Sequence, residues 1–332
     1  MGDGKRITIQ TIADEAQVSK STVSCYLNGK TDKMSAETRQ RIAAVIQKYD
    51  YRPSAAARLL TAGRSCLLGV LVCDITNGFA NRLVKGIAWA CRESGYQILV
   101  GTSEYEPKAE RLQLERMVDM KVDGVILQPT GRPTDSLQLL QRAEVPVICI
   151  DSKPEGAPLW VATSNYRSTY DAVLRCLGRG YSRCLLLSVD PMLLTSRQER
   201  CRACLDAAAR AGVPCRAKRI DADTPAETIL RLAEEGLSEG TLLFIPSCWL
   251  LPKVFRALAP LHGEIPDRLG LLGFDNEEWA DFSVPSVSTI VQPAFQEGAA
   301  AAALLIENLR GRPDVPSSAT LECEIRLRGS TR

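Results

Sequence analysis

The sequence predicts a small all-α unit in its first sixty residues, followed by a larger α/β body of two lobes. Over residues 9–60 the apolar residues recur at the three- and four-residue spacing of helices. From Ser65 onward, short apolar strands alternate with amphipathic helices, which is the pattern of parallel sheets covered by helices on both faces. With 332 residues, the chain is long enough for two or three domains.

Two short helices joined by a tight turn are predicted for residues 9–29. Apolar residues occupy positions 9, 12, 13 and 16 of the first helix and positions 23, 26 and 27 of the second. Ser19 is a good N-cap for the second helix, and Asn28-Gly29 ends it because both residues tolerate a left-handed backbone. The residues that then face outward on the second helix are Lys20, Ser21, Ser24 and Cys25. This is the layout of a helix-turn-helix, whose second helix enters the major groove of DNA.

A third helix is predicted to open at Ser35 and Thr38, with an apolar stripe at positions 42, 45 and 46. A further short helix is predicted for Pro53–Leu60, because proline suits the first helical position and three consecutive alanines favour a helix. The alternative for this segment is a simple linker. Residues 61–64 read as the linker to the body.

Charge is unevenly spread along the chain. Residues 1–64 hold eleven lysines and arginines against six acids, whereas the rest of the chain holds 30 basic and 33 acidic residues. A small basic module on a mildly acidic body is typical of a DNA-binding headpiece. A solvated basic surface would be an equal alternative if charge were the only observation.

The body is predicted to contain strands and helices in regular alternation. The strands are expected at residues 67–73, 97–101, 123–128, 145–150, 184–188, 242–245 and 269–273. The helices are expected at residues 79–95, 108–120, around Leu137, 166–179 and 198–211. Two such units in tandem place a ligand-binding cleft at the carboxyl ends of their strands.

Composition argues against several classes of protein. The single histidine, His262, leaves little machinery for acid–base catalysis or histidine metal sites, and we expect it in a surface loop. No glycine-rich phosphate loop or metal-binding cluster is apparent, so we expect no enzyme, no cofactor and no metal. The twelve scattered cysteines, the polar N-terminal residues and the absence of a long apolar run predict a cytoplasmic protein. Cys201 and Cys204 form a CxxC motif that we expect to serve packing, with redox chemistry as the alternative.

Polar and aromatic residues follow the predicted strands and suit a polyol ligand. Carboxylates accept sugar hydroxyls, arginine binds acids, and an aromatic ring packs against the apolar face of a sugar. The expected effector contacts are Asp74, Phe79, Asp151, Arg197, Arg200, Ser247, Trp249, Asp275, Trp279 and Gln292. Alternatives stay open for three of them, since Asp74 could cap a helix, Trp279 could belong to the core and Arg197 could be a surface charge.

The first sixty residues resemble the LacI/GalR (lactose-repressor) family of bacterial regulators, and the resemblance continues through the whole chain. The matching residues are Thr8, Ile12-Ala13, Val18-Ser19, Thr22-Val23-Ser24, Leu27-Asn28, Ser35, Thr38-Arg39, Ile42, Tyr51, Pro53, Ala57-Arg58 and Leu60. The resemblance implies an all-α helix-turn-helix headpiece with a hinge helix, followed by an α/β periplasmic-binding-protein-like body of two doubly wound parallel-sheet lobes.

The resemblance also implies which residues contact ligands. The implied DNA contacts are Thr8, Gln10, Lys20, Ser21, Thr22, Ser24, Cys25 and Asn28, with Ser54, Ala57 and Leu60 of the hinge helix in the minor groove. The residues that match the family's effector contacts are Asp151, Arg200, Asp275 and Gln292.

The chain departs from the family pattern at several positions. Gln17 stands where a glycine is usual, so it must accept a strained backbone or shift the turn. Cys25 replaces a common arginine that would hydrogen-bond guanine, so the operator preference should differ and depend more on Lys20 and Ser21. In the second lobe, Ser247-Cys248 replaces the usual polar pair and Ala203 replaces a common glycine. The last two changes argue against a standard neutral hexose as effector.

We therefore expect an effector-responsive repressor that binds near-palindromic operator DNA as a homodimer. Because residues 321–328 alternate like a strand rather than forming a leucine heptad, we expect a dimer and not a tetramer. The runs at 26–29, 275–280 and 289–293 are similar to the branch that serves gluconate, ketogluconate and 2-keto-3-deoxygluconate. The paired Arg197 and Arg200 also fit a sugar acid. The alternatives are a solute-binding protein of the sugar-transport type and an enzyme on an α/β fold.

The expected division of the chain has four parts. They are a DNA-binding domain at 1–52, a hinge helix and linker at 53–64, an N-terminal lobe at 65–164 plus 292–320, and a C-terminal lobe at 165–291 plus 321–332.

Overall fold

The computed structural model describes residues 7–27, 31–32, 34–51, 64–190, 194–235, 237, 240–314 and 316–332. The chain forms two compact units, Met1–Cys66 and Leu67–Arg332. The predicted hinge helix and the expected DNA contacts Asn28, Ser54, Ala57 and Leu60 lie outside the described residues.

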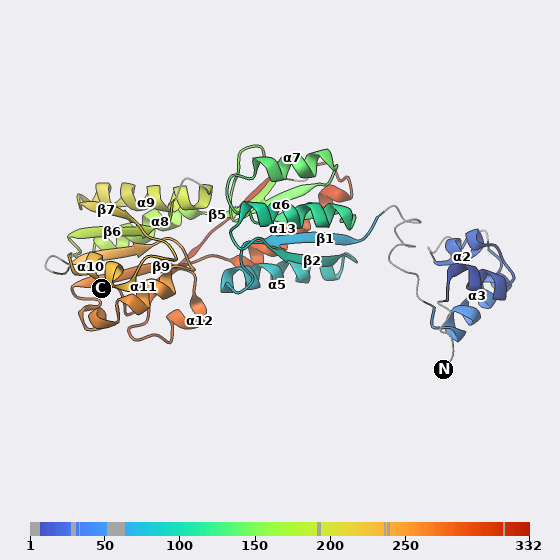
Figure 1. Ribbon diagram of the computed structural model, residues 1–332, viewed down its shortest axis with the longest axis horizontal. Coiled ribbons are helices and arrows are strands. Elements are labelled where there is room, and N and C mark those ends of the chain that lie inside the picture. Colours follow the sequence, from blue (N-terminus) through green and yellow to red (C-terminus); the bar gives the residue numbers. More distant parts are fainter. Residues whose placement is uncertain are drawn as a thin grey trace. The chain divides into compact units, whose positions relative to one another are not determined.

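The first unit contains the three predicted helices, α1 (Ile9–Glu15), α2 (Lys20–Leu27) and α3 (Ala36–Lys48) (Figure 1). They pack around Ile12, Val23 and Ile42, which are fully buried. The predicted caps are present, because Ser19 Oγ accepts a hydrogen bond from the Thr22 amide at 3.1 Å and Ser35 Oγ accepts one from the Thr38 amide at 3.2 Å. Side-chain caps therefore fix where α2 and α3 begin.

The turn between α1 and α2 contains the backbone strain that the sequence predicts. Gln17 has a φ of 52°, in the left-handed region that favours glycine. Its amide donates to the Asp14 carbonyl at 3.2 Å, and the next amide, of Val18, donates to Ala13 at 3.0 Å. The chain thus keeps the tight turn and accepts the strain.

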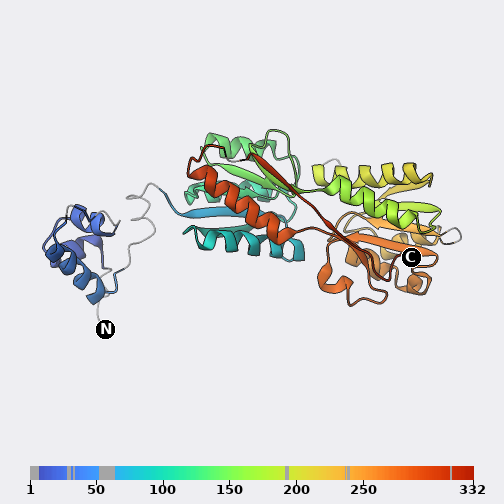
Figure 2. The same ribbon diagram turned by 180° about the vertical axis from the view of Figure 1, so that it is seen from behind.

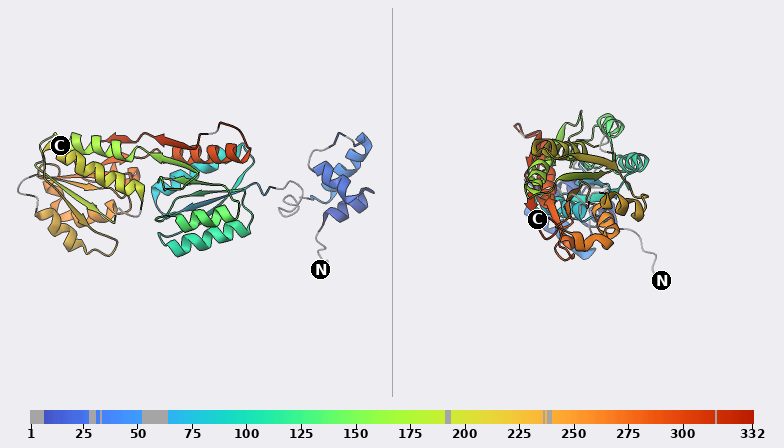
Figure 3. Two further views of the ribbon diagram at one scale, coloured as in Figure 1. Left: turned by 90° about the horizontal axis from the view of Figure 1, so that it is seen from above. Right: turned by 90° about the vertical axis from the view of Figure 1, so that its left-hand side faces the viewer.

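The second unit contains two six-stranded sheets, each covered by helices on both faces (Figure 3). The first sheet has the order β11-β5-β4-β3-β1-β2 and is parallel throughout. Its strands are β1 (Leu67–Val72), β2 (Gln97–Thr102), β3 (Gly124–Leu127), β4 (Val147–Ile150), β5 (Leu159–Thr163) and β11 (Ser318–Leu321). Its helices are α5 (Gly78–Arg92) and α13 (Ala294–Leu309) on one face, and α6 (Pro107–Asp119) and α7 (Thr134–Arg142) on the other.

The second sheet has the order β12-β10-β9-β8-β6-β7, and only its β10–β12 pair is antiparallel. Its strands are β6 (Arg183–Ser188), β7 (Cys215–Arg219), β8 (Thr241–Ile245), β9 (Leu269–Phe274), β10 (Ser288–Val291) and β12 (Glu324–Arg326). One face carries α8 (Asn165–Leu177) and α9 (Thr195–Ala211), and the other carries α10 (Ala226–Glu234) and α11 (Leu251–Ala257). The short α12 (Glu277–Ala280) and a 3-10 helix, η3 (Ala259–Glu264), complete this lobe.

The chain passes between the lobes at three places, after β5, after β10 and after β11 (Figure 2). The terminal segment that was expected to be one strand is split, since β11 pairs with the first sheet and β12 with the second. Each lobe therefore contains residues from distant parts of the sequence, and the crossing segments lie next to the carboxyl ends of the strands.

Two structural details differ from, or refine, the sequence-based expectations. His262 is half-buried in η3 rather than in a surface loop, with Nε2 at 3.0 Å from the Phe255 carbonyl oxygen. Its ring lies 4.3 Å from the Phe255 ring, so packing explains its burial. Cys201 and Cys204 are both buried in α9, as a packing role requires. No helix among the described residues is long and apolar enough to cross a membrane.

Candidate functional site

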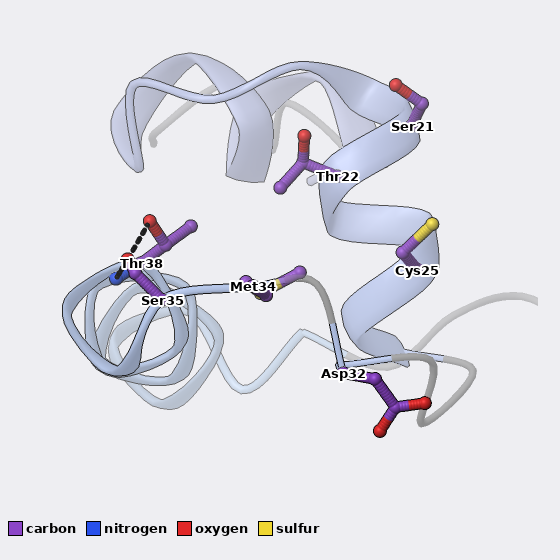
Figure 4. A pocket seen from close by; sticks show the side chains of 7 residues that line it. All are labelled: Ser21, Thr22, Cys25, Asp32, Met34, Ser35 and Thr38. Carbon is purple, nitrogen blue, oxygen red and sulfur yellow. Dashed lines mark hydrogen bonds between the residues drawn. The ribbon is translucent and has the colours of Figure 1, made fainter.

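The outward face of α2 presents small polar side chains. Lys20, Ser21 and Cys25 are exposed, and Thr22 and Ser24 are half-buried. Figure 4 shows Ser21 and Cys25 one turn apart on the same side of α2, whereas Thr22 points toward the space between α2 and α3. This face offers hydroxyl and thiol groups in place of the long donors that usually read guanine.

A hollow of about 580 Å³ borders this face of α2. The residues that line it are Ser21, Thr22, Cys25, Asp32, Met34, Ser35 and Thr38. The hydroxyls of Ser21 and Thr22 lie 2.7 and 2.8 Å from Ser19 Oγ, so the N-cap holds both side chains in place. Hydrogen bonds thus fix the side chains of Ser21 and Thr22 at the edge of the hollow.

The two expected DNA contacts near α1 are both exposed. Thr8 is the N-cap of α1 and forms a capping box with Thr11. The Gln10 amide donates to the Asp14 carboxylate one turn later. Their structural roles are therefore local, and a DNA contact for either residue remains a prediction.

In the second unit, Arg200 of α9 is the centre of a polar network that connects the lobes. It is only 5% exposed, and its guanidinium stacks 3.8 Å from the ring centre of Phe274. Its Nε donates to Asn165 Oδ1 at 2.7 Å, and its Nη1 donates to the Pro246 carbonyl at 3.0 Å. All three nitrogens donate within the protein, so Arg200 organises the site more than it binds a ligand.

The same network brings together three of the residues matched to family effector contacts. Arg200 Nη2 donates to Gln292 Oε1 at 2.9 Å and lies 3.5 Å from Asp151 Oδ1. Gln292 Nε2 in turn donates to Thr163 Oγ1 at 3.0 Å and to Asp151 Oδ1 at 3.2 Å. Asp151 follows β4 of the first lobe and Arg200 lies in α9 of the second, so this network spans the two lobes.

Two buried acids lie beside this network. Asp275 Oδ1 accepts the Gln292 amide at 2.8 Å, and Glu297 Oε1 accepts the Asp151 amide at 2.7 Å. Burial raises the pKa of Asp275 to about 7 and the pKa of Glu297 well above its ordinary value. For both acids, burial therefore favours the protonated form over the charged one.

Four buried polar atoms in this region have no hydrogen-bond partner among the described residues: Ser247 Oγ, Trp249 Nε1, Asp275 Oδ2 and Glu297 Oε2. Buried polar groups are almost always satisfied, so a cluster of unsatisfied ones calls for an explanation such as a ligand. Asp151 and Asp275 also have left-handed backbones, with φ of 63° and 51°, at the ends of their strands. Such strain concentrates at binding sites.

Arg197 differs from Arg200 in its surroundings. It is half-exposed and makes no hydrogen bond or ion pair within the described ranges. Its positive charge acts on the thiols of Cys201 in its own helix and of Cys73 at the end of β1 in the other lobe. It therefore lies next to the first lobe with its guanidinium available to an anion.

A second set of aromatic and polar contacts joins the two lobes. The rings of Tyr105 and Trp249, one from each lobe, lie 6.2 Å apart. Asn77 Nδ2 donates to Cys248 Sγ at 3.1 Å, also between the lobes. Burial is the main cause that raises the pKa of Tyr105, so its hydroxyl stays neutral. The lobes thus meet through side chains at the carboxyl ends of β2 and β8.

Three expected effector contacts have other surroundings. Phe79 is 4% exposed and packs in the apolar core of the first lobe, so its ring does not face a ligand. Trp279 packs against Phe255, with ring centres 5.3 Å apart, as the core alternative describes. Asp74 Oδ1 accepts from the Thr76 amide at 2.8 Å in the turn before α5, while the cap of α5 is Asn77.

Sequence reasoning missed Tyr105, Arg82, Asn165 and Glu297. Arg82 pairs with Glu278 of the other lobe at 3.0 Å and lies 3.9 Å from Asp275. One signal was available for Glu297, because it is a charged residue directly before the run of alanines in the segment that forms α13. Asn165 and Tyr105 carried no comparable signal, since polar residues at strand ends are common.

The comparisons with known proteins agree with this arrangement along the whole chain. Residues 8–54 match the family model of bacterial regulatory proteins of the lacI family. Residues 68–171 match the periplasmic binding protein domain, and residues 173–331 match the periplasmic binding protein-like domain.

Two full-length relatives and one solved structure are similar to the chain. The transcriptional regulator KdgR of Bacillus subtilis is 30% identical over 97% of both chains. The transcriptional regulator PtxS of Pseudomonas plecoglossicida is 30% identical over 98% of this chain and 96% of its own. A lac repressor dimer bound to operator and the anti-inducer ONPF has a TM-score of 0.83 at 20% identity, over 98% of this chain and 99% of that one. These relatives disfavour the solute-binding alternative, and the chain belongs to the LacI family of helix-turn-helix, DNA-binding transcription regulators.

Proposed function

We propose that this regulator is a cytoplasmic, homodimeric repressor without enzymatic activity, whose affinity for a near-palindromic operator is changed by a small ligand bound between its lobes. The observation that carries the proposal is the inter-lobe polar network with its four unsatisfied buried atoms. A ligand that satisfies those atoms would stabilise one arrangement of the lobes over another. The lac repressor structure, a dimer bound to its operator and to the anti-inducer ONPF, supports the same assignment.

We also propose that the chain divides into the four parts expected from the sequence: a DNA-binding domain, a hinge helix with linker, and two lobes. The two sheets support separate lobes, and the three crossings between them support lobes built from discontinuous segments. Residues 53–64 would connect the DNA-binding domain to the first lobe.

For DNA, we propose that α2 enters the major groove and that Lys20, Ser21 and Cys25 face the base edges, because these residues are exposed on one face. Thr8, Gln10, Thr22, Ser24 and Asn28 would contact the operator from the headpiece, and Ser54, Ala57 and Leu60 from the hinge segment. Lys20 is the one long donor in the exposed part of α2 that the structure describes. A hydroxyl and a thiol in the remaining positions favour a base code different from the arginine–guanine code.

For the effector, we propose a sugar acid. Arg197 supports this choice, because a half-exposed guanidinium without a partner in the described ranges is suited to a carboxylate. Asp151 and Asp275 would accept sugar hydroxyls, the unpaired Oε2 of Glu297 would take part in a further hydrogen bond, and Trp249 would pack against the sugar ring. Asp74, Ser247 and Gln292 would complete the set, with Phe79 and Trp279 acting through packing only.

The test combines operator binding with a ligand panel. Fluorescence anisotropy with the DNA upstream of the chain's own gene is measured with and without gluconate, 2-ketogluconate, 2-keto-3-deoxygluconate and the matching neutral sugars. We expect one acid to change operator affinity and the neutral sugars to leave it unchanged. Leu60→Ala should weaken operator binding while calorimetric effector binding stays intact. Tight binding of a neutral sugar with no binding of any acid would overturn the sugar-acid assignment, and absence of operator binding in every state would overturn the repressor assignment.

A further inference from the structure

Three cysteine side chains from separate elements converge in the second lobe. Cys184 lies in β6, Cys204 in α9 and Cys215 at the start of β7. Their sulfur atoms all lie within 4.8 Å of one another, and those of Cys184 and Cys204 are 3.6 Å apart. Cys184 and Cys215 are directly opposite each other in the parallel β6–β7 pair, which fixes two of the three positions through the backbone. We call this group the cysteine triad.

One of the two cysteines of the CxxC motif belongs to the triad, and the other does not. Cys201 and Cys204 are both buried in α9, but only Cys204 is among the three cysteines whose sulfur atoms converge. The convergence is therefore specific to one of the two motif cysteines. Cys201 provides a matched control, with the same residue type, the same helix and a similar burial.

The triad is accessible at one corner. Cys184 is 2% exposed and Cys204 is fully buried, whereas Cys215 is half-exposed on β7, the edge strand of its sheet. An ion could reach the sulfurs past Cys215 without opening the core.

We propose that the cysteine triad is a binding site for a soft, thiophilic cation such as Zn²⁺ or Cu⁺. A zinc–sulfur bond of about 2.3 Å places three sulfurs in a trigonal arrangement about 4 Å apart, within the spread seen here. Binding of Zn²⁺ forms three metal–sulfur bonds and releases the protons of the coordinating thiols to solvent, with no change of oxidation state. Water at the Cys215 corner would supply the fourth ligand that Zn²⁺ prefers.

Coordination requires the thiolate form of each cysteine, so each coordinating thiol gives up its proton when the ion binds. Cys215 is the least buried of the three cysteines. The first metal–sulfur bond would form at the accessible corner.

The triad also bears on the inter-lobe network through α9. Cys204 lies four residues after Arg200 in this helix, and a bound cation would connect α9 covalently to β6 and β7. The inference does not depend on the effector proposal, because it concerns only the residues of the second lobe.

The test uses the full-length protein, reduced with a phosphine and freed of metal with a chelator. Cd²⁺ is the probe, and its binding is followed by the ultraviolet thiolate-to-cadmium charge-transfer band and by metal analysis after gel filtration. We expect wild type and Cys201→Ala to bind one equivalent with the same affinity. Cys204→Ala and Cys215→Ala should each bind this equivalent more than about 100-fold more weakly, since even the loss of a group that only orients a metal ligand costs about 10–100-fold.

Thermal unfolding of each protein with and without Cd²⁺ provides the second measurement. The ion should raise the unfolding midpoint of wild type and Cys201→Ala but not that of Cys215→Ala, whose edge position makes it the variant least affected in folding. Equal binding by all four proteins, equal loss in Cys201→Ala, or no bound ion in wild type would overturn the proposal. Formation of a Cys184–Cys204 disulfide in air, without cation binding after reduction, would overturn it in favour of an oxidisable pair.

Discussion

Replacing Arg200 with methionine should destabilise the body strongly, because the guanidinium is buried and fully engaged. Its loss removes the donor from Asn165 Oδ1, the Pro246 carbonyl and Gln292 Oε1, at distances of 2.7, 3.0 and 2.9 Å. Each buried acceptor left without a donor costs about 1 kcal/mol or more. The Asp151 carboxylate, with 15% of its side chain exposed, also loses its cation. The expected decrease in the free energy of unfolding is about 3–5 kcal/mol, the range for breaking one side of a buried ion pair.

The measurement is urea unfolding of the full chain, followed by tryptophan fluorescence and fitted to the transition of the body, since a two-unit protein need not unfold in one step. Arg197→Met is the matched control, with the same change on the same helix at a half-exposed residue. It should change stability by no more than about 0.5 kcal/mol. A loss below about 1 kcal/mol for Arg200→Met, or equal losses for both variants, would refute the organising role of Arg200.

Three further predictions concern the pH dependence, the turn and the base code. Burial raises the pKa of Asp275 from 3.8 to about 7, so the folded protein favours the protonated carboxyl more than the unfolded chain does. The free energy of unfolding should therefore fall as the pH rises from about 4 to about 7. Asp275→Asn should flatten this slope in urea titrations across the range, and an unchanged slope would contradict the assignment. Gln17→Gly should stabilise the headpiece by roughly 0.5–1 kcal/mol in thermal unfolding, because glycine adopts the φ of 52° without strain. A destabilised variant would show that Gln17 adopts this backbone conformation without strain. Cys25→Arg should shift selection from a randomised operator library toward guanine opposite α2 by about 1–3 kcal/mol, and an unchanged preference would place Cys25 away from the bases.

Sequence reasoning was most accurate where local chemistry decides the structure. Ser19 and Ser35 cap α2 and α3 as predicted, because a serine before an apolar-periodic segment satisfies the first free amides of a helix. The apolar strand β1 was predicted within one residue for the same kind of reason, since its run of buried residues is uninterrupted. The left-handed backbone of Gln17 followed from the family's usual glycine at that position.

Two of the elements that were missed lack a clear local signal. β7 is polar and mostly exposed at a sheet edge, so its sequence reads as a loop. α13 contains a long alanine-rich stretch with little periodicity, and its position depends on packing against α5. The effector site was predicted only in part, because sequence spacing does not show which side chains are buried. Spacing identified Arg197 and Arg200 as a pair, but only tertiary contacts show that one is buried and engaged and the other is half-exposed.

If a ligand held between the lobes controls operator affinity, a residue that binds the ligand but not the DNA should change only the response to the ligand. Operator affinity is followed by fluorescence anisotropy during titration with the sugar acid selected from the panel, for wild type and Arg197→Met. We expect the ligand to change the operator affinity of wild type. For Arg197→Met we expect an unchanged ligand-free affinity and a response shifted at least about tenfold to higher ligand concentration. Control of operator affinity by a ligand at Arg197 would be refuted by an identical response in both proteins, or by a ligand that binds wild type without changing its operator affinity.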